Sequence, residues 1–387
     1  MSTTKAWVIH PAKGDPRTAG PTELRLEELS LGAPGDGEVL VEPLYGSWER
    51  NMTHALARNP VDVCRARGEE TVVLGNSGVG RVLQGGPGTT VREGELCLFA
   101  LPHKFDAFGY PIQLMGFDLP GRRGILAQRG IWKETDLAPL PASSRHSLPQ
   151  WAAFGVRYLT AWSSWKIAYG AWRLQMSEED QEVPFVWAWG GGTSFATVQL
   201  AQLFKARTAI ISGTAERLAL AAKLGITPID RRPFQEISRD EERLARDPEY
   251  AKRCAAAEDA FLEIVRAHTE GRGASIFIDY IGTPLIHATV RALARQGVIA
   301  TAGWLEGKEI KLVRAFECIK RHIHVHTHGY RRSDVAPAMR FGEEHGWMPV
   351  LGDGARIYSF EEIPSLARDF ADGKISSYFP IYQINPV

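Results

Sequence analysis

Apolar residues between positions 183 and 230 follow a strand, helix, strand order. The segment Val183–Trp189 is apolar almost throughout, which predicts a strand buried on both faces of a parallel sheet. Three glycines, Gly190–Gly192, end this run. From Ser194 apolar residues recur at helical spacing, at Ala196, Leu200, Leu203 and Phe204. This spacing predicts a helix with one apolar stripe on the sheet, and Thr208–Ile211 predicts the next strand.

The glycines Gly190, Gly191 and Gly192 lie where the predicted strand turns into the predicted helix, which Thr193 and Ser194 open. Glycines at such a turn let backbone N–H groups approach a pyrophosphate, and the helix N-terminus supplies a partial positive charge. The pattern therefore predicts a dinucleotide site, although Ser194 stands where a third glycine is usual. The alternative is a similar turn in an unrelated α/β protein.

The choice of cofactor depends on the end of the second strand, where an NAD site normally presents an acid to the ribose 2′-hydroxyl. Here Ser212 occupies that place, Thr214 and Arg217 follow it, and Arg231 and Arg232 come after the next strand. Hydroxyl and guanidinium groups in place of an acid favour a 2′-phosphate, and therefore NADPH. For Arg217 a solvated helix position is the alternative.

The first 160 residues show no regular alternation of strands and helices. Short strand-like runs are separated by Gly and Pro turns, at Ala6–Ile9, Glu38–Leu44, Thr71–Leu74 and Glu95–Ala100. These runs predict a mainly β domain. The Gly-, Pro- and aromatic-rich segment Pro102–Gly124 predicts a long ordered loop of the kind that often carries function.

The pattern after residue 230 resumes the sheet beyond an insertion. Arg231–Arg272 is charged and helix-prone, which predicts a solvated helical insertion on the surface or an oligomer contact. Strands are expected at Ser275–Asp279 and Val298–Thr301. Gly282 and Gly303 follow these two strands, at the carboxyl edge where an open α/β sheet binds its ligand, so we expect both to face the nicotinamide.

Four histidines alternate with other residues in RHIHVHTHGY, at His322, His324, His326 and His328. A strand would direct all four imidazoles to one face. A metal site is one interpretation, but zinc usually takes His from more than one element. A strand with one polar face is the other, and it places His328 at the strand end nearest the ligand.

Length, charge and cysteine content narrow the class. A chain of 387 residues allows two domains, and we expect the boundaries 1–160, with 345–387 returning, and 161–344. Lys+Arg and Asp+Glu both total 45, so no net field attracts nucleic acid or an anionic membrane. The four cysteines lack zinc spacing. Without an apolar leader or spanning segment, a soluble cytoplasmic protein is expected.

The order of these motifs resembles the medium-chain dehydrogenase/reductase superfamily. The resemblance rests on the β-rich start, RYLTAW, WGGG followed by QLA, the IDYIGTP loop and the C-terminal return. It implies a GroES-like β domain joined to a Rossmann NADPH-binding domain, and a homodimer or homotetramer. Zinc alcohol dehydrogenases of that superfamily carry a Gly-His-Glu motif where this chain has Leu74–Gly80, LGNSGVG, so no metal is expected.

Within the superfamily, the charged insertion and the Gly116-Phe117-Asp118 segment resemble the crotonyl-CoA carboxylase/reductase group of enoyl-thioester reductases. The resemblance implies catalytic roles for Phe117, Asp118 and His328, and a cofactor contact for Thr160. The group's active-site Asn would fall where this chain has Trp48 or Arg50. Simple reduction is therefore expected rather than carbon dioxide fixation.

The expected reaction transfers hydride from NADPH to the β-carbon of an α,β-unsaturated acyl thioester, bound to CoA or to a carrier. The resulting enolate needs hydrogen-bond donors and then a proton, from water or from His328, with Asp118 orienting either one. Two alternatives remain: a zinc-free quinone or enone oxidoreductase, and a non-catalytic NADPH-binding protein.

Overall fold

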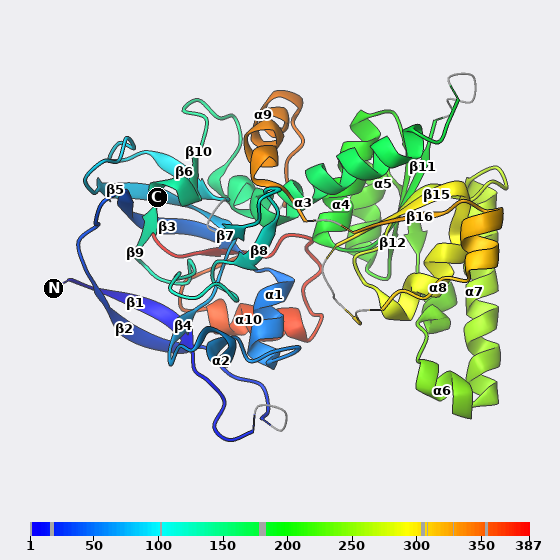
Figure 1. The fold of residues 1–387 in the computed structure, drawn as a ribbon, viewed down its shortest axis with the longest axis horizontal. Coiled ribbons are helices and arrows are strands. Elements are labelled where there is room, and N and C mark those ends of the chain that lie inside the picture. The colour runs from blue at the N-terminus through cyan, green and yellow to red at the C-terminus, as the bar shows by residue number, and fades with distance from the viewer. Residues whose placement is uncertain are drawn as a thin grey trace. The chain divides into compact units, whose positions relative to one another are not determined.

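The computed structural model describes residues 2–15, 19–100, 103–177, 183–302, 306–307, 309–327, 329–352 and 355–387. The chain divides into two compact units. The first joins Met1–Leu159 to Arg331–Val387, and the second is Thr160–Tyr330 (Figure 1). None of the described helices is long and apolar enough to cross a membrane.

The first unit is built mainly from β-strands. A three-stranded sheet has the order β2-β1-β4, with β1 Ser2–Ile9, β2 Arg25–Leu31 and β4 Val72–Val73. A seven-stranded sheet has the order β10-β6-β5-β3-β18-β17, and β9 also pairs with β3. Its strands are β3 Glu38–Ser47, β5 Gly78–Gly85, β6 Leu96–Phe99, β9 Gly130–Lys133, β10 Leu137–Pro139, β17 Ile357–Tyr358 and β18 Ile381–Gln383. The C-terminal strand β18 thus lies antiparallel to β3 in this sheet.

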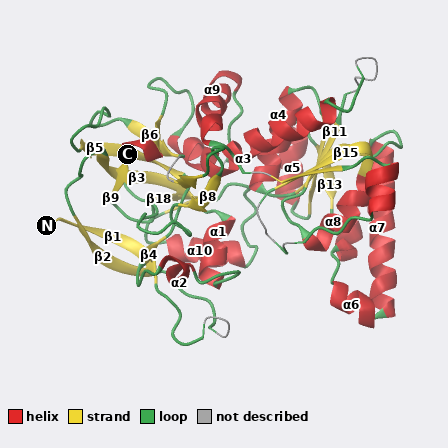
Figure 2. Ribbon diagram, in the orientation of Figure 1, coloured by secondary structure: helices red, strands yellow, loops and turns green. Residues whose placement is uncertain are grey.

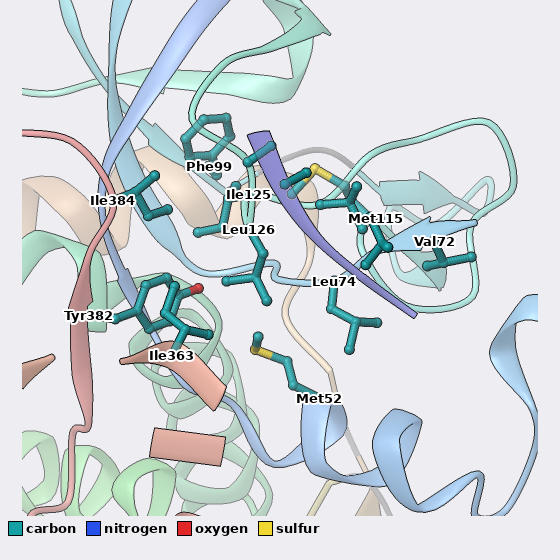
Figure 3. Close-up of a cluster of buried hydrophobic side chains, with 14 of the residues drawn as sticks. Met52, Val72, Leu74, Phe99, Met115, Ile125, Leu126, Ile363, Tyr382 and Ile384 are labelled. Atoms are coloured by element: carbon teal, nitrogen blue, oxygen red, sulfur yellow. The ribbon is translucent and has the colours of Figure 1, made fainter. Parts of the chain in front are cut away.

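The core of the first unit lies between these strands and short helices. Helices of this unit are α1 Arg50–Ala57, α2 Val63–Arg67, α9 Val335–His345 and α10 Ile363–Ala371, and α3 Leu148–Arg173 begins in it. Met52 of α1 and Ile363 of α10 pack with Leu74, Ile125 and Tyr382 (Figure 3). The C-terminal residues therefore complete a core that the N-terminal residues begin.

The segment Pro102–Gly124 is more regular than the sequence predicts. From residue 103 on it contains an antiparallel hairpin of β7 His103–Phe105 and β8 Pro111–Leu114, so the prediction of one long loop was wrong. Asp106 closes the turn because its carboxylate accepts hydrogen bonds from the amides of Phe108 and Tyr110, both at 2.9 Å. Phe108 and Ile112 are exposed, which hides the usual strand pattern.

The second unit is a doubly wound parallel sheet, which confirms the predicted Rossmann fold class. Its strand order is β13-β12-β11-β14-β15-β16. The strands are β11 Phe185–Trp189, β12 Arg207–Ser212, β13 Thr227–Asp230, β14 Ala274–Ile278, β15 Leu293–Thr301 and β16 His324–Thr327. Every residue of β11 is buried, as its apolar run predicts. Helices α4 Gly192–Leu203 and α5 Ala215–Lys223 lie on one face, and α7 Pro248–His268 and α8 Thr283–Ala292 on the other (Figure 2).

Two helices differ from expectation. In α4 Ala196 and Leu200 are buried, but Leu203 and Phe204 are exposed because the helix ends there. The charged segment after β13 forms α6 Glu241–Arg246 and α7, and α7 is not a solvated addition to the surface. Its Phe261 and Val265 are buried in the core of the second unit, so this helix covers one face of the sheet.

The histidine pattern forms a shorter strand than predicted. Strand β16 begins at His324 and contains His326, whereas His322 precedes it with a φ of 54°. The prediction that one strand face carries all four imidazoles was therefore wrong for His322. Burial lowers the pKa of His326. His328 lies outside the described residues.

A buried polar network fixes the loop after β14. Asp279 is fully buried, and its carboxylate accepts hydrogen bonds from the amides of Ile281 and Gly282, both at 3.0 Å. The hydroxyl of Thr289 donates to the other oxygen of Asp279 at 2.7 Å and accepts the indole N–H of Trp189 at 2.7 Å. The network thus joins the last residue of β11 to the loop that follows β14.

Replacing Thr289 tests this network. Thr289→Val keeps the shape but leaves a buried carboxylate oxygen and a buried indole N–H without their partner, so we expect a loss of about 2–3 kcal/mol in the free energy of unfolding. Urea unfolding measures the loss. Thr289→Ser keeps the hydroxyl and should lose clearly less, and an equal loss in both variants would contradict a hydrogen-bonding role.

Candidate nucleotide-binding and catalytic site

The glycine turn after β11 brings two strand ends together. The N–H of Gly190 donates to the carbonyl of Ile211 on β12 at 2.9 Å. A Cβ on Gly190 would lie 2.6 Å from that same oxygen, so only glycine fits. A Cβ on Gly191 would meet only Ser194 Oγ, at 3.8 Å. The turn is therefore tight against β12 and open above Gly191.

Helix α4 begins directly at this turn without a side-chain cap. Gly191 is its N-cap, and no side chain accepts a hydrogen bond from the first-turn amides of Gly192, Thr193 and Ser194 among the residues the structure describes. Uncapped amides at the start of a helix of 12 residues attract an anion. The structure thus brings the five predicted residues Gly190–Ser194 into one turn that fits a pyrophosphate.

The residues predicted to contact a 2′-phosphate lie close together in the structure. The hydroxyl of Ser212 accepts the amide of Thr214, the N-cap of α5, at 3.2 Å. The carbonyl of Ser212 accepts the amide of Arg231 at 3.0 Å. The guanidinium of Arg231 in turn donates to Ser238 Oγ at 2.9 Å. Ser212, Thr214 and Arg231 therefore lie together, and Arg217 is half-buried on α5.

An ion pair beside these residues escaped the sequence analysis. Asp230, the last residue of β13, is the register partner of Ser212. Its carboxylate accepts hydrogen bonds from Arg232 Nε at 2.9 and 3.0 Å and from Arg232 Nη2 at 2.5 Å. These hydrogen bonds hold the pKa of Asp230 below its usual value. The Asp-Arg-Arg run at 230–232 is the sequence signal for this pair.

The loop after β14 contacts the same helix as the glycine turn. Gly282 has a φ of 103°, and a Cβ there would lie 2.9 Å from the carbonyl of Glu306, which explains the glycine. The Tyr280 hydroxyl lies 3.4 Å from Thr197 Oγ1 on α4. Burial raises the pKa of Tyr280, so its hydroxyl stays protonated. Thr160 lies one helical turn before Ser164, and Gly303 lies outside the described residues.

In the first unit, a buried arginine organises the segment expected to hold the active-site Asn. Arg157 of α3 donates to Ser47 Oγ and to the carbonyl of Trp48, each at 2.6 Å, and its Nη1 lies 2.9 Å from the carboxylate of Glu49. Burial raises the pKa of Glu49 despite the opposing effects of Arg157 and of a hydrogen bond with Ser77. The buried indole of Trp48 donates to Thr53 at 3.0 Å.

The segment Leu74–Gly80, which replaces the zinc-binding motif, carries a polar group that the sequence analysis missed. Asn76 is buried, and neither amide atom has a hydrogen-bond partner among the described residues. A buried amide without partners is unusual and costs free energy, so it is a candidate for ligand contact. No group of three or more His, Cys, Asp or Glu side chains in the described parts of the chain could hold a metal.

Arg67 binds the backbone of the loop that contains Phe117 and Asp118. Arg67 of α2 donates to the carbonyls of Phe117 at 3.4 Å and Arg122 at 2.9 Å. Phe117 is buried, and Asp118 Oδ1 accepts the amide of Leu114 at 2.6 Å. The phenyl ring and the carboxylate are therefore fixed by local contacts of this unit.

The buried pair of Arg157 and Glu49 gives a pH-dependent prediction. Arg157→Met leaves the Glu49 carboxylate without its counter-ion, so the free energy of unfolding should fall by about 3–5 kcal/mol near neutral pH. The pKa of Glu49, already raised by burial, should rise further without Arg157. Below the usual Glu pKa of about 4.3 the carboxyl is neutral in both states, so only the lost hydrogen bonds to Ser47 and Trp48 should contribute there, and the loss should grow as pH rises.

Unfolding curves at several pH values measure that loss. The double variant Glu49→Gln/Arg157→Met removes both charges and should recover part of the stability at neutral pH. A loss independent of pH, or no recovery in the double variant, would show that Arg157 acts only through packing.

Comparisons with known proteins place the fold. Residues 192–344 match the family model described as "Zinc-binding dehydrogenase". No curated protein sequence matches the chain significantly.

Solved structures match along nearly the whole chain. The crotonyl-CoA carboxylase/reductase AntE, in complex with NADP, is 21% identical with a TM-score of 0.78, covering 100% of this chain and 95% of its own. The 2-octenoyl-CoA carboxylase reductase CinF, in complex with NADP and 2-octenoyl-CoA, is 18% identical with a TM-score of 0.75, covering 99% and 88%. A thermostable alcohol dehydrogenase from Pyrobaculum aerophilum is 16% identical with a TM-score of 0.71, covering 99% and 100%.

The resemblance predicted from the sequence is thus confirmed at the level of fold, since the similar structures include crotonyl-CoA carboxylase/reductases as well as alcohol dehydrogenases. The chain has the two-part fold of the medium-chain dehydrogenases and reductases.

Proposed function

We propose that this protein is an NADPH-dependent reductase that transfers hydride to the β-carbon of an α,β-unsaturated acyl thioester. The observation that carries the proposal is the uncapped glycine turn of α4, which one hydrogen bond joins to the strand ending in Ser212. A pyrophosphate site and a corner of hydroxyl and guanidinium groups are thereby parts of one structure. Such a pair fits a dinucleotide with a 2′-phosphate.

The residues of the second unit would hold the cofactor in two places. The first-turn amides of α4 and the turn Gly190–Gly192 would bind the pyrophosphate. Ser212, Thr214 and Arg231 would bind the 2′-phosphate, with Arg231 oriented by its hydrogen bond to Ser238. Arg217, Thr160, Gly282 and Gly303 complete the proposed contacts. Bound NADPH supplies the hydride, and the protein supplies orientation and electrostatics.

The substrate class rests on the structural likeness together with residues of the first unit. AntE and CinF are named for their action on enoyl-CoA thioesters, and the CinF structure contains 2-octenoyl-CoA. Phe117 would back the wall of the acyl site, because its ring is packed in the core of the first unit. Asp118 would orient a proton donor, with His328 as the donor to the α-carbon. The buried indole of Trp48 favours simple reduction over carboxylation.

An absorbance assay tests the reaction. Purified protein with NADPH and crotonyl-CoA should consume the cofactor and form the saturated acyl-CoA, identified by its mass. NADH should support a lower rate, because Ser212 offers no acid to a ribose 2′-hydroxyl. Parallel reactions with bicarbonate should give no added carboxylate mass, and with a quinone or a simple enone should be slower.

Each result has a clear consequence. Carboxylated product would replace simple reduction with reductive carboxylation. Faster turnover of a quinone than of any enoyl thioester would identify a quinone oxidoreductase. Tight NADPH binding without turnover of either class would indicate a binding protein.

A charge placed at the helix N-terminus tests the pyrophosphate site directly. Thr193→Glu puts a carboxylate where the cofactor phosphates would bind, so NADPH affinity should fall at least about tenfold. Helix stability should not fall, because an acid in the first turn is worth about 0.3–1 kcal/mol in favour of the helix. Calorimetric titration measures affinity, and thermal unfolding measures stability. Thr193→Gln is the neutral control, and equal effects of both variants would argue against a charge effect.

A further inference from the structure

The ion pair of Asp230 and Arg232 lies at the corner that would receive the 2′-phosphate. We infer that Arg232 sets the preference for NADPH over NADH by neutralising Asp230. The inference rests on the proposed function only in that it assumes a nicotinamide dinucleotide at the glycine turn. Arg232 is here a positioning residue, because it acts through the carboxylate of Asp230.

The register of the sheet places Asp230 beside the residue that replaces the usual acid. Ser212 and Asp230 are the last residues of neighbouring parallel strands and are partners in register. Strands lie about 4.8 Å apart, and partners in register present their side chains to the same side of the sheet. The chain therefore keeps a carboxylate one strand away from the position that binds a ribose 2′-hydroxyl in NAD sites.

Arg232 donates hydrogen bonds to both oxygens of the Asp230 carboxylate. Its Nε lies within 3.0 Å of both oxygens, its Nη2 donates at 2.5 Å, and its backbone amide donates at 2.9 Å. Both oxygens of Asp230 are thus engaged by one neighbouring residue two positions along the chain. A carboxylate held in this way has little capacity left to accept a hydrogen bond from a ribose hydroxyl.

The balance of charge at the corner depends on Arg232. With Asp230 and Arg232 paired, Arg231 is left as the net positive group beside Ser212, which suits a phosphate. Without Arg232, the charge of Asp230 would oppose that of Arg231, and the carboxylate could accept a ribose hydroxyl. Both side chains are partly exposed, 33% for Asp230 and 69% for Arg232, so the pair can change without exposing a core.

Calorimetric titration of Arg232→Ala with NADPH and with NADH tests the inference. The ratio of the two dissociation constants should move toward NADH by about tenfold, because NADPH binds more weakly and NADH more tightly. Asp230→Asn alone should not move the ratio toward NADH, since it removes the negative charge and leaves the Arg232 guanidinium unpaired, which favours a 2′-phosphate. Asp230→Asn/Arg232→Ala should return the ratio toward that of the wild type.

Arg253→Ala is the matched control. Arg253 pairs with Glu236 at 2.9 Å with similar exposure, and it should leave the ratio unchanged. Equal weakening of both cofactors by Arg232→Ala, or a loss of NADPH affinity that the double variant does not reverse, would overturn the inference but leave the proposed function standing. Failure of the wild type to bind either cofactor would overturn the proposed function and this inference with it.

Discussion

The hydrogen bond from the amide of Gly190 to the carbonyl of Ile211 is the constraint on which the candidate nucleotide site of the second unit depends. It requires a backbone without a Cβ at Gly190, since a side chain would meet the same oxygen. Because Ser212 is the next residue of β12, this one bond sets the spacing between the helix N-terminus and the corner proposed to bind a 2′-phosphate. This one hydrogen bond therefore links three features: the position of α4, the need for glycine at 190 and the end of the neighbouring strand β12.

The two units stabilise buried carboxylates in different ways. Asp279 receives two backbone amides and one hydroxyl, without any cation. Glu49 faces the guanidinium of Arg157, which also binds Ser47 and the Trp48 carbonyl. In both cases burial raises the pKa of the acid, so the partners offset a real cost of desolvation. Each carboxylate thereby specifies a loop: the turn after β14 in one unit and the end of β3 in the other.

The sequence predicts those parts of the fold in which local pattern and burial agree. Strand β11 is apolar because both its faces are covered. Three glycines directly after such a strand indicate a tight turn into a helix. The β7–β8 hairpin escapes prediction because its apolar Phe108 and Ile112 are exposed, and α7 was judged solvated because its charged face conceals Phe261 and Val265. Whether these side chains are buried or exposed depends on which other segments pack against them, and the local sequence does not contain that information.

The candidate site shows the same division. Ser212, Thr214 and Arg231 were expected at one corner and lie together there, since strand order in a parallel sheet determines the place. The ion pair of Asp230 and Arg232 and the partnerless amide of Asn76 depend on side-chain contacts, which a pattern cannot reveal. The catalytic roles of Phe117, Asp118 and His328 stay predictions.

The network that holds Asp279 also has a spectroscopic consequence. Trp189 is buried, is held by Thr289, and directly precedes Gly190. Reduced nicotinamide cofactors absorb light in the range where tryptophan emits, so an immobile indole at the turn is a natural energy donor to a cofactor bound there. Trp189 is one of the 11 tryptophans of the chain, and its place beside Gly190 would make its emission sensitive to a reduced cofactor bound at the turn.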